Sequence, residues 1–348
     1  MPWDSSSGIW ETPYSPPDPR ELPAIRSYLC DLMEEPRTVS IFLEFLADDR
    51  LAYRPPGPPI VAVQRLLEDE RNRLAKASLY WISPEMTQVA VAAAESLPED
   101  LRIDQTHQPA THGFVVFGEP IGSYVGDLSN ERRVPIVAMT WGATRHPAQD
   151  EKATWVTFYS PRDKGYIRHI MTRMANRPPR PDEVNAVVRA TPEWMWDNEI
   201  IIPHTGTIAD LNHSHELLQT LRSDSVMPWM KVLYSSWLLM TQPGITEVEQ
   251  QRASRKQQQR DQRRGIGQSD VRLIRVHRRH RDSGPASKQT DESTDREFTV
   301  RWMVRGHWRN QAHGPGYTLR RPTWINPHVK GPDDKPLKTG NIVNVWDR

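Results

Sequence analysis

The chain has 348 residues, of which 37% are hydrophobic and 26% charged, and its formal net charge is +1. This length exceeds the size at which one hydrophobic core usually stops growing, so we expect two domains, or one large domain with an appendage. The composition is too apolar for wholesale disorder and too polar for a membrane protein, which leaves a folded protein in water.

Residues 1–59 predict a proline-rich leader followed by a helical segment. The prolines and serines of the first twenty residues resist helix formation, and this stretch lacks the basic and apolar regions of a secretory signal. Helix is expected over about 22–47, interrupted near Pro36, and residues 55–59 predict a stiff extended connection. Cys30, the one cysteine of the chain, lies in this amphipathic stretch, so we expect a buried hydrophobe rather than a nucleophile.

Residues 60–245 predict an acidic α/β body, a sheet flanked by helices. The expected helices are 60–74, 84–97 with Ser83 as N-cap, 208–222 and 226–241. The expected strands are 77–82, 113–117, 134–141, 153–159 and 194–202. The Met and Trp stripe of the last helix is typical of core packing, and its longest apolar run falls far short of the roughly 20 residues that span a membrane.

Residues 246–270 predict a polar, basic helical connector and the domain boundary. The stretch 246–264 is almost wholly polar and compatible with helix, and Gly265 and Gly267 would end it. A polar helix usually bridges two domains or becomes ordered when it binds a partner. A protein partner is therefore one candidate ligand of residues 246–264. Residues 271–348 then predict a smaller basic β-rich module, with strands near 271–279, 297–309, 322–329 and 342–346 and a polar loop at 282–295. The predicted fold class is α+β.

Charge is segregated along the chain. Residues 252–348 contain 22 Lys and Arg against 10 Asp and Glu, a net charge of +12, which leaves −11 for residues 1–251. A basic region attracts polyanions, while an acidic body discourages their indiscriminate binding. The alternative is that the two regions simply attract each other.

The stretch 298–311 predicts a strand with one apolar and one basic face. Because successive strand residues point to opposite faces, Trp302, Val304 and Trp308 share one side. The other side carries Arg301, Arg305, His307 and Arg309. Side chains two apart on a strand are about 7 Å apart, close to the phosphate spacing of one nucleic-acid strand, so this row could follow a phosphate backbone.

Further polar and aromatic residues extend the candidate site. Asn310 and Gln311 can hydrogen-bond sugar, base edges or phosphate, and the rings of Trp324 and Tyr317 offer stacking surfaces. The complete predicted nucleic-acid or phosphate-binding set is Arg301, Arg305, His307, Trp308, Arg309, Asn310, Gln311, Arg320, Arg321, Trp324, His328 and Lys330. The competing interpretation is a small β-module with a solvated charged face and buried tryptophans.

The sequences VRGHWRNQ at 304–311 and RRPTWINPHVKGP at 320–332, with Gly314-Pro-Gly316 between them and Lys335-Pro-Leu337 after them, form a distinctive signature. It resembles the carboxy-terminal signature of uncharacterised actinobacterial proteins that are often encoded near plasmid- or prophage-derived genes. The runs 113–120 and 271–276 are similar to parts of the same proteins. The resemblance covers most of residues 75–348 and implies a mobile-element context, with no assigned activity.

Enzyme chemistry has weaker support. A metal-independent nuclease could use His307 as its proton-transfer residue, with Arg305, Arg309 and Lys330 on the phosphate and His313 or His328 as a second proton-transfer group. His213 and His215 are two apart and do not share a helical face, so no metal site is predicted, and no cofactor motif is present.

The sequence therefore predicts a cytoplasmic protein with no membrane contact that binds nucleic acid, DNA or RNA, through a basic β-face in residues 252–348. The first alternative is a protein-interaction or assembly module of a mobile-element system, and the second is the nuclease. Phosphate contacts weaken steeply as salt rises, which separates nucleic-acid binding from protein interaction.

Overall fold

The computed structural model describes residues 3–4, 9–48, 51, 53–126, 132–145, 151–175, 177–219, 226–242, 244–277 and 302–330. The chain divides into two compact units, residues 1–276 (unit 1) and 277–348 (unit 2). Helices and mixed sheets make up the described chain, so the α+β fold class is confirmed. Within these residues no helix combines the length and the apolar character needed to cross a membrane.

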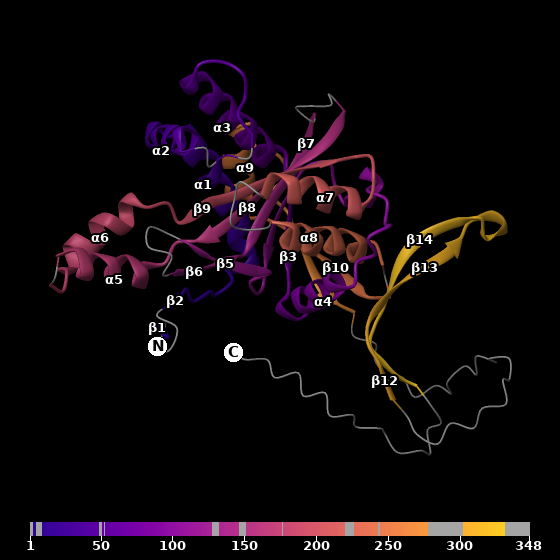
Figure 1. Cartoon of the computed structure of the whole chain (residues 1–348). Helices are drawn as coiled ribbons and strands as arrows, with labels where there is room; N and C mark the ends of the chain where they lie inside the picture. Colours follow the sequence, from indigo (N-terminus) through magenta and orange to yellow (C-terminus); the bar gives the residue numbers. More distant parts are fainter. Residues whose placement is uncertain are drawn as a thin grey trace. The chain divides into compact units, whose positions relative to one another are not determined.

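Unit 1 is built on a seven-stranded mixed sheet in the order β10-β11-β3-β4-β7-β8-β9 (Figure 1). Its strands are β3 (Ser78–Ile82), β4 (Gly113–Phe117), β7 (Ala138–Arg145), β8 (Lys152–Pro161), β9 (Trp194–Pro203), β10 (Thr246–Gln251) and β11 (Val271–Val276). Strands β11, β3 and β4 run parallel, and the other neighbours pair antiparallel. A four-stranded sheet joins β1 (Trp3–Asp4), β2 (Ile9–Glu11), β6 (Arg132–Ile136) and β5 (Gly122–Gly126) in that spatial order.

Helices cover both faces of the large sheet, as a parallel segment requires. One face packs against α1 (Leu22–Glu34), α2 (Pro36–Ala47) and α3 (Pro59–Lys76). The other packs against α4 (Pro84–Glu95) and α8 (Met227–Met240), where the ring of Trp237 lies 5.4 Å from that of Trp141 on β7. The remaining helices of unit 1 are α5 (Lys164–Ala175), α6 (Pro181–Ala190), α7 (Ile208–Gln219) and α9 (Arg255–Arg263), with short 3-10 turns at Pro19–Glu21 and Gln105–His107.

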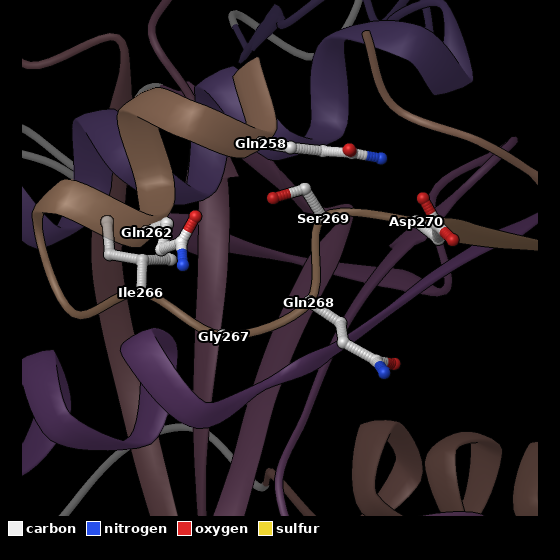
Figure 2. A pocket seen from close by; sticks show the side chains of 7 residues that line it. All are labelled: Gln258, Gln262, Ile266, Gly267, Gln268, Ser269 and Asp270. Carbon is white, nitrogen blue, oxygen red and sulfur yellow. The ribbon is translucent and has the colours of Figure 1, made fainter. Parts of the chain in front are cut away.

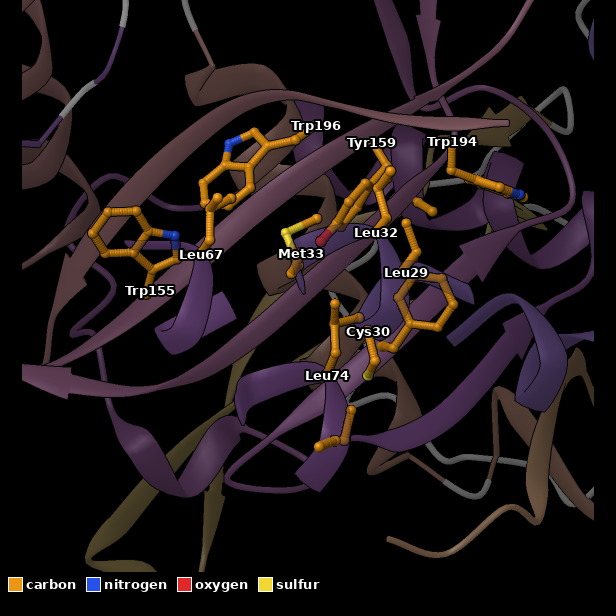
Figure 3. Packing of buried hydrophobic residues seen from close by; sticks show 14 of the residues in the cluster. Leu29, Cys30, Leu32, Met33, Leu67, Leu74, Trp155, Tyr159, Trp194 and Trp196 are labelled. Carbon is orange, nitrogen blue, oxygen red and sulfur yellow. The ribbon is translucent and has the colours of Figure 1, made fainter. Parts of the chain in front are cut away.

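The core on the α1–α3 side joins aliphatic helix residues to aromatic sheet residues. Figure 3 shows Leu29, Cys30 and Met33 of α1 in the same buried cluster as Tyr159 of β8 and Trp196 of β9. Cys30 is 1% exposed, which confirms the prediction of a buried hydrophobe, and burial raises the pKa of its thiol to about 11. The stripe on α8 is also buried, as its pattern predicts.

A buried polar network fixes α3 to the sheet. The Glu70 carboxylate is fully buried and accepts hydrogen bonds from Thr157 Oγ1 at 2.9 Å and the Tyr159 hydroxyl at 2.5 Å, and another from Thr140. Arg73, one turn further along α3, donates from Nε at 2.8 Å. A buried carboxylate needs such partners, so this network orients α3 rather than forming a solvent-accessible site.

The predicted connector differs from the structure. The sequence predicts one helix over 246–264, whereas residues Thr246–Gln251 form strand β10 and only Arg255–Arg263 are helical, with Ser254 as N-cap. Strand β10 pairs with β11, and β11 in turn pairs with β3 in the centre of unit 1. Tertiary pairing therefore overrides the helix-compatible composition, and the two compact units divide after Val276 rather than at 246–270.

The described part of unit 2, residues 277 and 302–330, contains two pairs of antiparallel strands. They are β12 (Trp302–Val304) with β15 (His328–Lys330), and β13 (His307–His313) with β14 (Leu319–Ile325). A short 3-10 turn, Pro315–Tyr317, connects β13 to β14. The predicted strand 342–346 and the predicted loop 282–295 lie outside the described residues.

Candidate nucleic-acid interface

The four described strands of unit 2 form two ladders that follow one another in a single two-stranded ribbon. Val304 lies opposite His328, and His307 lies opposite Ile325. Two residues therefore separate the two ladders on each side of the ribbon, a two-residue step at 305–306 and at 326–327. The register is thus continuous from residue 302 to 313 and from 319 to 330. The step contains Pro327, which has no N–H to donate to a ladder.

Two tryptophans and a glycine hold the centre of the ribbon together. Trp308 and Trp324 lie directly opposite each other, and their rings make an edge contact with centroids 5.4 Å apart. A Cβ atom at Gly306 would stand 2.3 Å from the Trp324 ring. Glycine therefore allows the indole to lie on the backbone at this point.

One face of the ribbon presents basic and polar side chains. His307, Arg309 and Gln311 alternate along β13 and share a face, and Arg321 lies opposite Gln311 on the same face. The side chains of Arg309 and Arg321 are exposed, as is that of Arg305, two residues before His307. In the described part of the chain, no carboxylate pairs with any of these three arginines.

The predicted site residues divide between the two faces. Trp308, Asn310, Arg320 and Trp324 occupy the face opposite Arg309, because Trp308 is opposite Trp324 and Ala312 is opposite Arg320. His328 accompanies Val304 at the other ladder, and only the backbone of Lys330 is described, paired with Trp302. Arg301 lies outside the described residues. The structure thus places His307, Arg309, Gln311 and Arg321 together but separates them from Arg320.

Trp324 differs from the prediction that its ring offers a stacking surface. The side chain is 3% exposed, and its indole Nε1 donates to Asn326 Oδ1 at 3.1 Å. A buried ring cannot receive a base, so Trp324 stabilises the ribbon instead. Tyr317, at the turn, is 73% exposed and keeps an open ring.

The ribbon is basic and contains no acidic residue. Residues 302–330 contain five Lys and Arg, three His and no Asp or Glu. With the boundary after Val276, unit 2 has 14 Lys and Arg against 8 Asp and Glu, and unit 1 has 31 against 36. The basic excess of unit 2 is therefore concentrated in this ribbon.

The histidines of the ribbon are spread out. His307 and His313 lie at opposite ends of β13, which separates their Cα atoms by about 20 Å at the usual strand rise. His328 lies opposite Val304, on the other face of the ribbon from His307. Nuclease chemistry needs two proton-transfer groups around one phosphate, and this arrangement does not bring two histidines to one point.

One pocket of unit 1 lacks a catalytic constellation. Figure 2 shows a pocket of about 300 Å³ between α9 and the segment that leads to β11. Among its lining residues only Asp270 is ionisable, and its carboxylate accepts hydrogen bonds from the Ala253 N–H and the Gln250 amide, both at 3.1 Å. Across the described ranges, no group of three or more His, Cys, Asp or Glu side chains is placed to hold a metal ion.

One feature of unit 1 was not predicted from the sequence, the helical pair α5 and α6. The signal was present, because Ile167, Ile170, Met171 and Met174 follow the spacing of an amphipathic helix. Prolines 178 and 179 lie between the two helices, and Pro181 is the first residue of α6.

No protein-family model and no curated protein matches this chain. Among solved structures, a match is found to "Crystal structure of AcrVA2", with a TM-score of 0.39 and 11% sequence identity. The similarity covers 91% of this chain and 88% of that chain.

Proposed function

We propose that the protein binds nucleic acid through the ribbon 302–330, with its arginines on the phosphate backbone. The observation that carries this proposal is the absence of any acidic residue from the ribbon, together with the exposed arginines 305, 309 and 321, which have no ion-pair partner among the described residues. Guanidinium groups free of carboxylates are available to phosphate oxygens, which they bind in a bidentate manner.

The shape of the ribbon favours duplex DNA. A two-stranded β-ribbon fits the major groove of B-form DNA, whereas the A-form major groove of RNA is too narrow and deep for side chains to read. Arg309 and Arg321 share one face with Gln311, whose amide can contact base edges. We therefore expect duplex DNA to bind more tightly than duplex RNA of the same sequence.

The experiment is fluorescence anisotropy with labelled duplex DNA, duplex RNA and single-stranded oligonucleotides, at low and moderate salt. Its test variant replaces Arg305, Arg309 and Arg321 with Gln. Its matched control replaces Arg255, Lys256 and Arg260 of α9, which are also exposed. Point variants are preferable to removal of residues 252–348, because that deletion would take β11 out of the sheet of unit 1.

The expected result is binding that weakens at least tenfold in the ribbon variant and no more than twofold in the α9 control. Equal weakening in both variants would mean that general positive charge, rather than the ribbon, attracts the nucleic acid. Absence of binding by the unmodified protein at low salt would refute the proposal and favour the protein-interaction alternative.

A further inference from the structure

The turn between β13 and β14, residues 314–318, exposes an aromatic ring at the tip of the ribbon (Figure 1). The side chain of Tyr317 is 73% exposed, and none of the described residues makes a ring contact or a hydrogen bond with it. Burial of an aromatic ring is a large source of folding free energy, and a tyrosine hydroxyl usually finds a partner when it is buried. The ribbon obtains neither contribution from Tyr317.

The backbone holds Tyr317 in a conformation that its side chain disfavours. Its φ is +55°, in the left-handed region that bulky residues rarely adopt, and it follows Gly314 and Gly316 at +77° and +65°. The Tyr317 N–H donates to the Gly314 carbonyl at 3.1 Å, and the Thr318 hydroxyl donates to the Pro315 carbonyl at 3.2 Å. Glycine would adopt this conformation without strain. Because strained positions cluster at ligand-binding sites, the conformation indicates a role for the ring in binding.

A second exposed apolar side chain lies beside the tip, on the basic face of the ribbon. Leu319 is 53% exposed and lies opposite His313. Opposite residues of an antiparallel pair share a face, and so do alternate residues of one strand, so Leu319 shares its face with Arg321 and Arg309. Arg321 follows Leu319 after two residues, about 7 Å along the strand. Apolar and cationic side chains therefore belong to one continuous surface.

A nucleic acid offers a partner for each kind of side chain on this surface. Its phosphates can bind the guanidinium groups, for which the ribbon has no Asp or Glu that competes, and its bases can stack on the ring of Tyr317. In an intact duplex, neighbouring bases already cover both faces of each base. Where a duplex ends in a single strand, an unstacked base can offer a free face to an aromatic ring.

We propose, on the basis of the function proposed for the ribbon, that its ligand is a junction between duplex and single-stranded DNA. Arg309 and Arg321 would bind phosphates of the duplex, and Tyr317 would stack on the first unpaired base. Leu319 would cover the adjoining sugar. Successive nucleotides of one strand are about 3.4 Å apart along the duplex axis, so Arg321 and Leu319 would be about two base steps apart on the DNA.

The test measures binding of the full-length protein to labelled DNA by fluorescence anisotropy. The ligands are a blunt duplex, the same duplex with a single-stranded 3′ or 5′ overhang, and the single strand alone. A 2-aminopurine at the first unpaired position reports stacking on the unmodified protein by the quenching of its fluorescence. Tyr317→Leu removes the flat ring but keeps an apolar side chain, and Tyr317→Trp keeps a ring. Val248→Ala, at a position of β10 that is 51% exposed, is the matched control.

The unmodified protein should bind one of the overhang duplexes about tenfold more tightly than the blunt duplex, as one base stacked on an aromatic ring supplies. It should also quench the 2-aminopurine. Tyr317→Leu should lose the preference and keep its affinity for the blunt duplex within twofold. Tyr317→Trp and Val248→Ala should retain both the preference and the affinity.

Equal affinity for blunt and overhang duplexes, unquenched 2-aminopurine, or a preference that survives in Tyr317→Leu would overturn the junction inference and leave the proposed function of the ribbon in place. Binding of the single strand as tightly as of the overhang duplex would also overturn it, because no junction would be needed. Absence of binding to every ligand would refute the proposed function itself, and the junction inference with it.

Discussion

The indole of Trp324 lies on the backbone of Gly306, so closely that a Cβ atom there would stand 2.3 Å from the ring. Gly306 sits between Arg305 and His307, and Trp324 lies opposite Trp308. The packing of one buried ring thus fixes the backbone position of the strand that carries the exposed arginines 305 and 309. The candidate binding face and the stability of the ribbon depend on the same few residues.

The substitution Gly306→Ala should loosen the ribbon, because either the Trp324 ring or the strand must shift to accept the methyl group. We expect amide hydrogen exchange at residues 307–311 to accelerate at least tenfold. Gly244→Ala is the matched control, because a Cβ at Gly244 meets no atom within 4 Å. Unchanged exchange in Gly306→Ala would show that the packing of Trp324 does not hold the strand in place.

Removal of Asp261 should destabilise unit 1 strongly. Its carboxylate pairs with the Arg26 guanidinium at 3.2 Å, and the side chains of Arg26 and Asp261 are buried, at 0% and 1% exposure. Burial lowers the pKa of Arg26, and Asp261 opposes that shift. Asp261→Ala leaves a buried charge unpaired, at an expected cost of ~3–5 kcal/mol in the free energy of unfolding. Urea denaturation measures this cost.

The control for that variant is Glu249→Ala, which removes the exposed ion pair of Glu249 with Arg275. Exposed pairs contribute about 0–1 kcal/mol, so its midpoint should stay near that of the unmodified protein. Similar midpoints for Asp261→Ala and Glu249→Ala would contradict a structural role for the buried pair.

The stability of unit 1 should fall as the pH drops below neutrality. Burial lowers the pKa values of His107, His112 and His204, and Arg73 and Lys76 lower that of His112 further. The unfolded chain then binds more protons than the folded one below the ordinary histidine pKa of about 6.5, so the free energy of unfolding decreases as the pH falls through that value.

Urea denaturation at pH 7.5 and pH 5.5 measures this dependence. In the double variant His107→Gln/His204→Gln, the difference between the two pH values should shrink. His213→Gln, at an exposed position, is the control and should keep the difference seen in the unmodified protein. A rise in stability at pH 5.5 would contradict the assignment.

Loss of the Asp163 side chain should lower the free energy of unfolding more than loss of an ordinary helix cap. Asp163 caps α5 and also accepts a hydrogen bond from the buried Trp10 indole. Asp163→Ala should cost about 1 kcal/mol for the cap and about 1–3 kcal/mol for the orphaned indole N–H. Ser254→Ala, which removes only the cap of α9, is the control for the first contribution. Equal unfolding free energies for the two variants would show that the Trp10 hydrogen bond does not stabilise the protein.

Local patterns predicted most elements of unit 1 well. Ser83 accepts a hydrogen bond from the Met86 N–H, as its place before Pro84 predicts, and the apolar runs at 113–117 and 153–159 are the strands β4 and β8. One predicted strand, 134–141, is divided between β6 and β7, which belong to different sheets. The Ser83 cap and the two apolar runs depend on residues that are neighbours in the chain, which a sequence shows directly.

The features that the sequence did not predict depend on contacts between residues distant in the chain. The polar segment at Thr246–Gln251 is a strand because Val271–Val276 lies beside it, and Asp261 is buried because Arg26 reaches it across 235 positions. In the ribbon, strand alternation placed Arg309 and Trp308 on opposite faces, but it could not show which of Arg320 and Arg321 shares the face of Arg309. That assignment follows from the register across the turn at Gly314–Thr318, which the sequence does not specify.

The salt dependence of DNA binding reports how many phosphates the ribbon neutralises. On B-form DNA, the logarithm of the binding constant falls with the logarithm of salt concentration, with a slope of about 0.9 for each phosphate that the protein neutralises. Replacement of Arg305, Arg309 and Arg321 with Gln should therefore reduce the slope by about 2.7, whereas the α9 control should leave it unchanged. Equal slopes for the ribbon variant and the unmodified protein would contradict the assignment of the ribbon as the nucleic-acid interface.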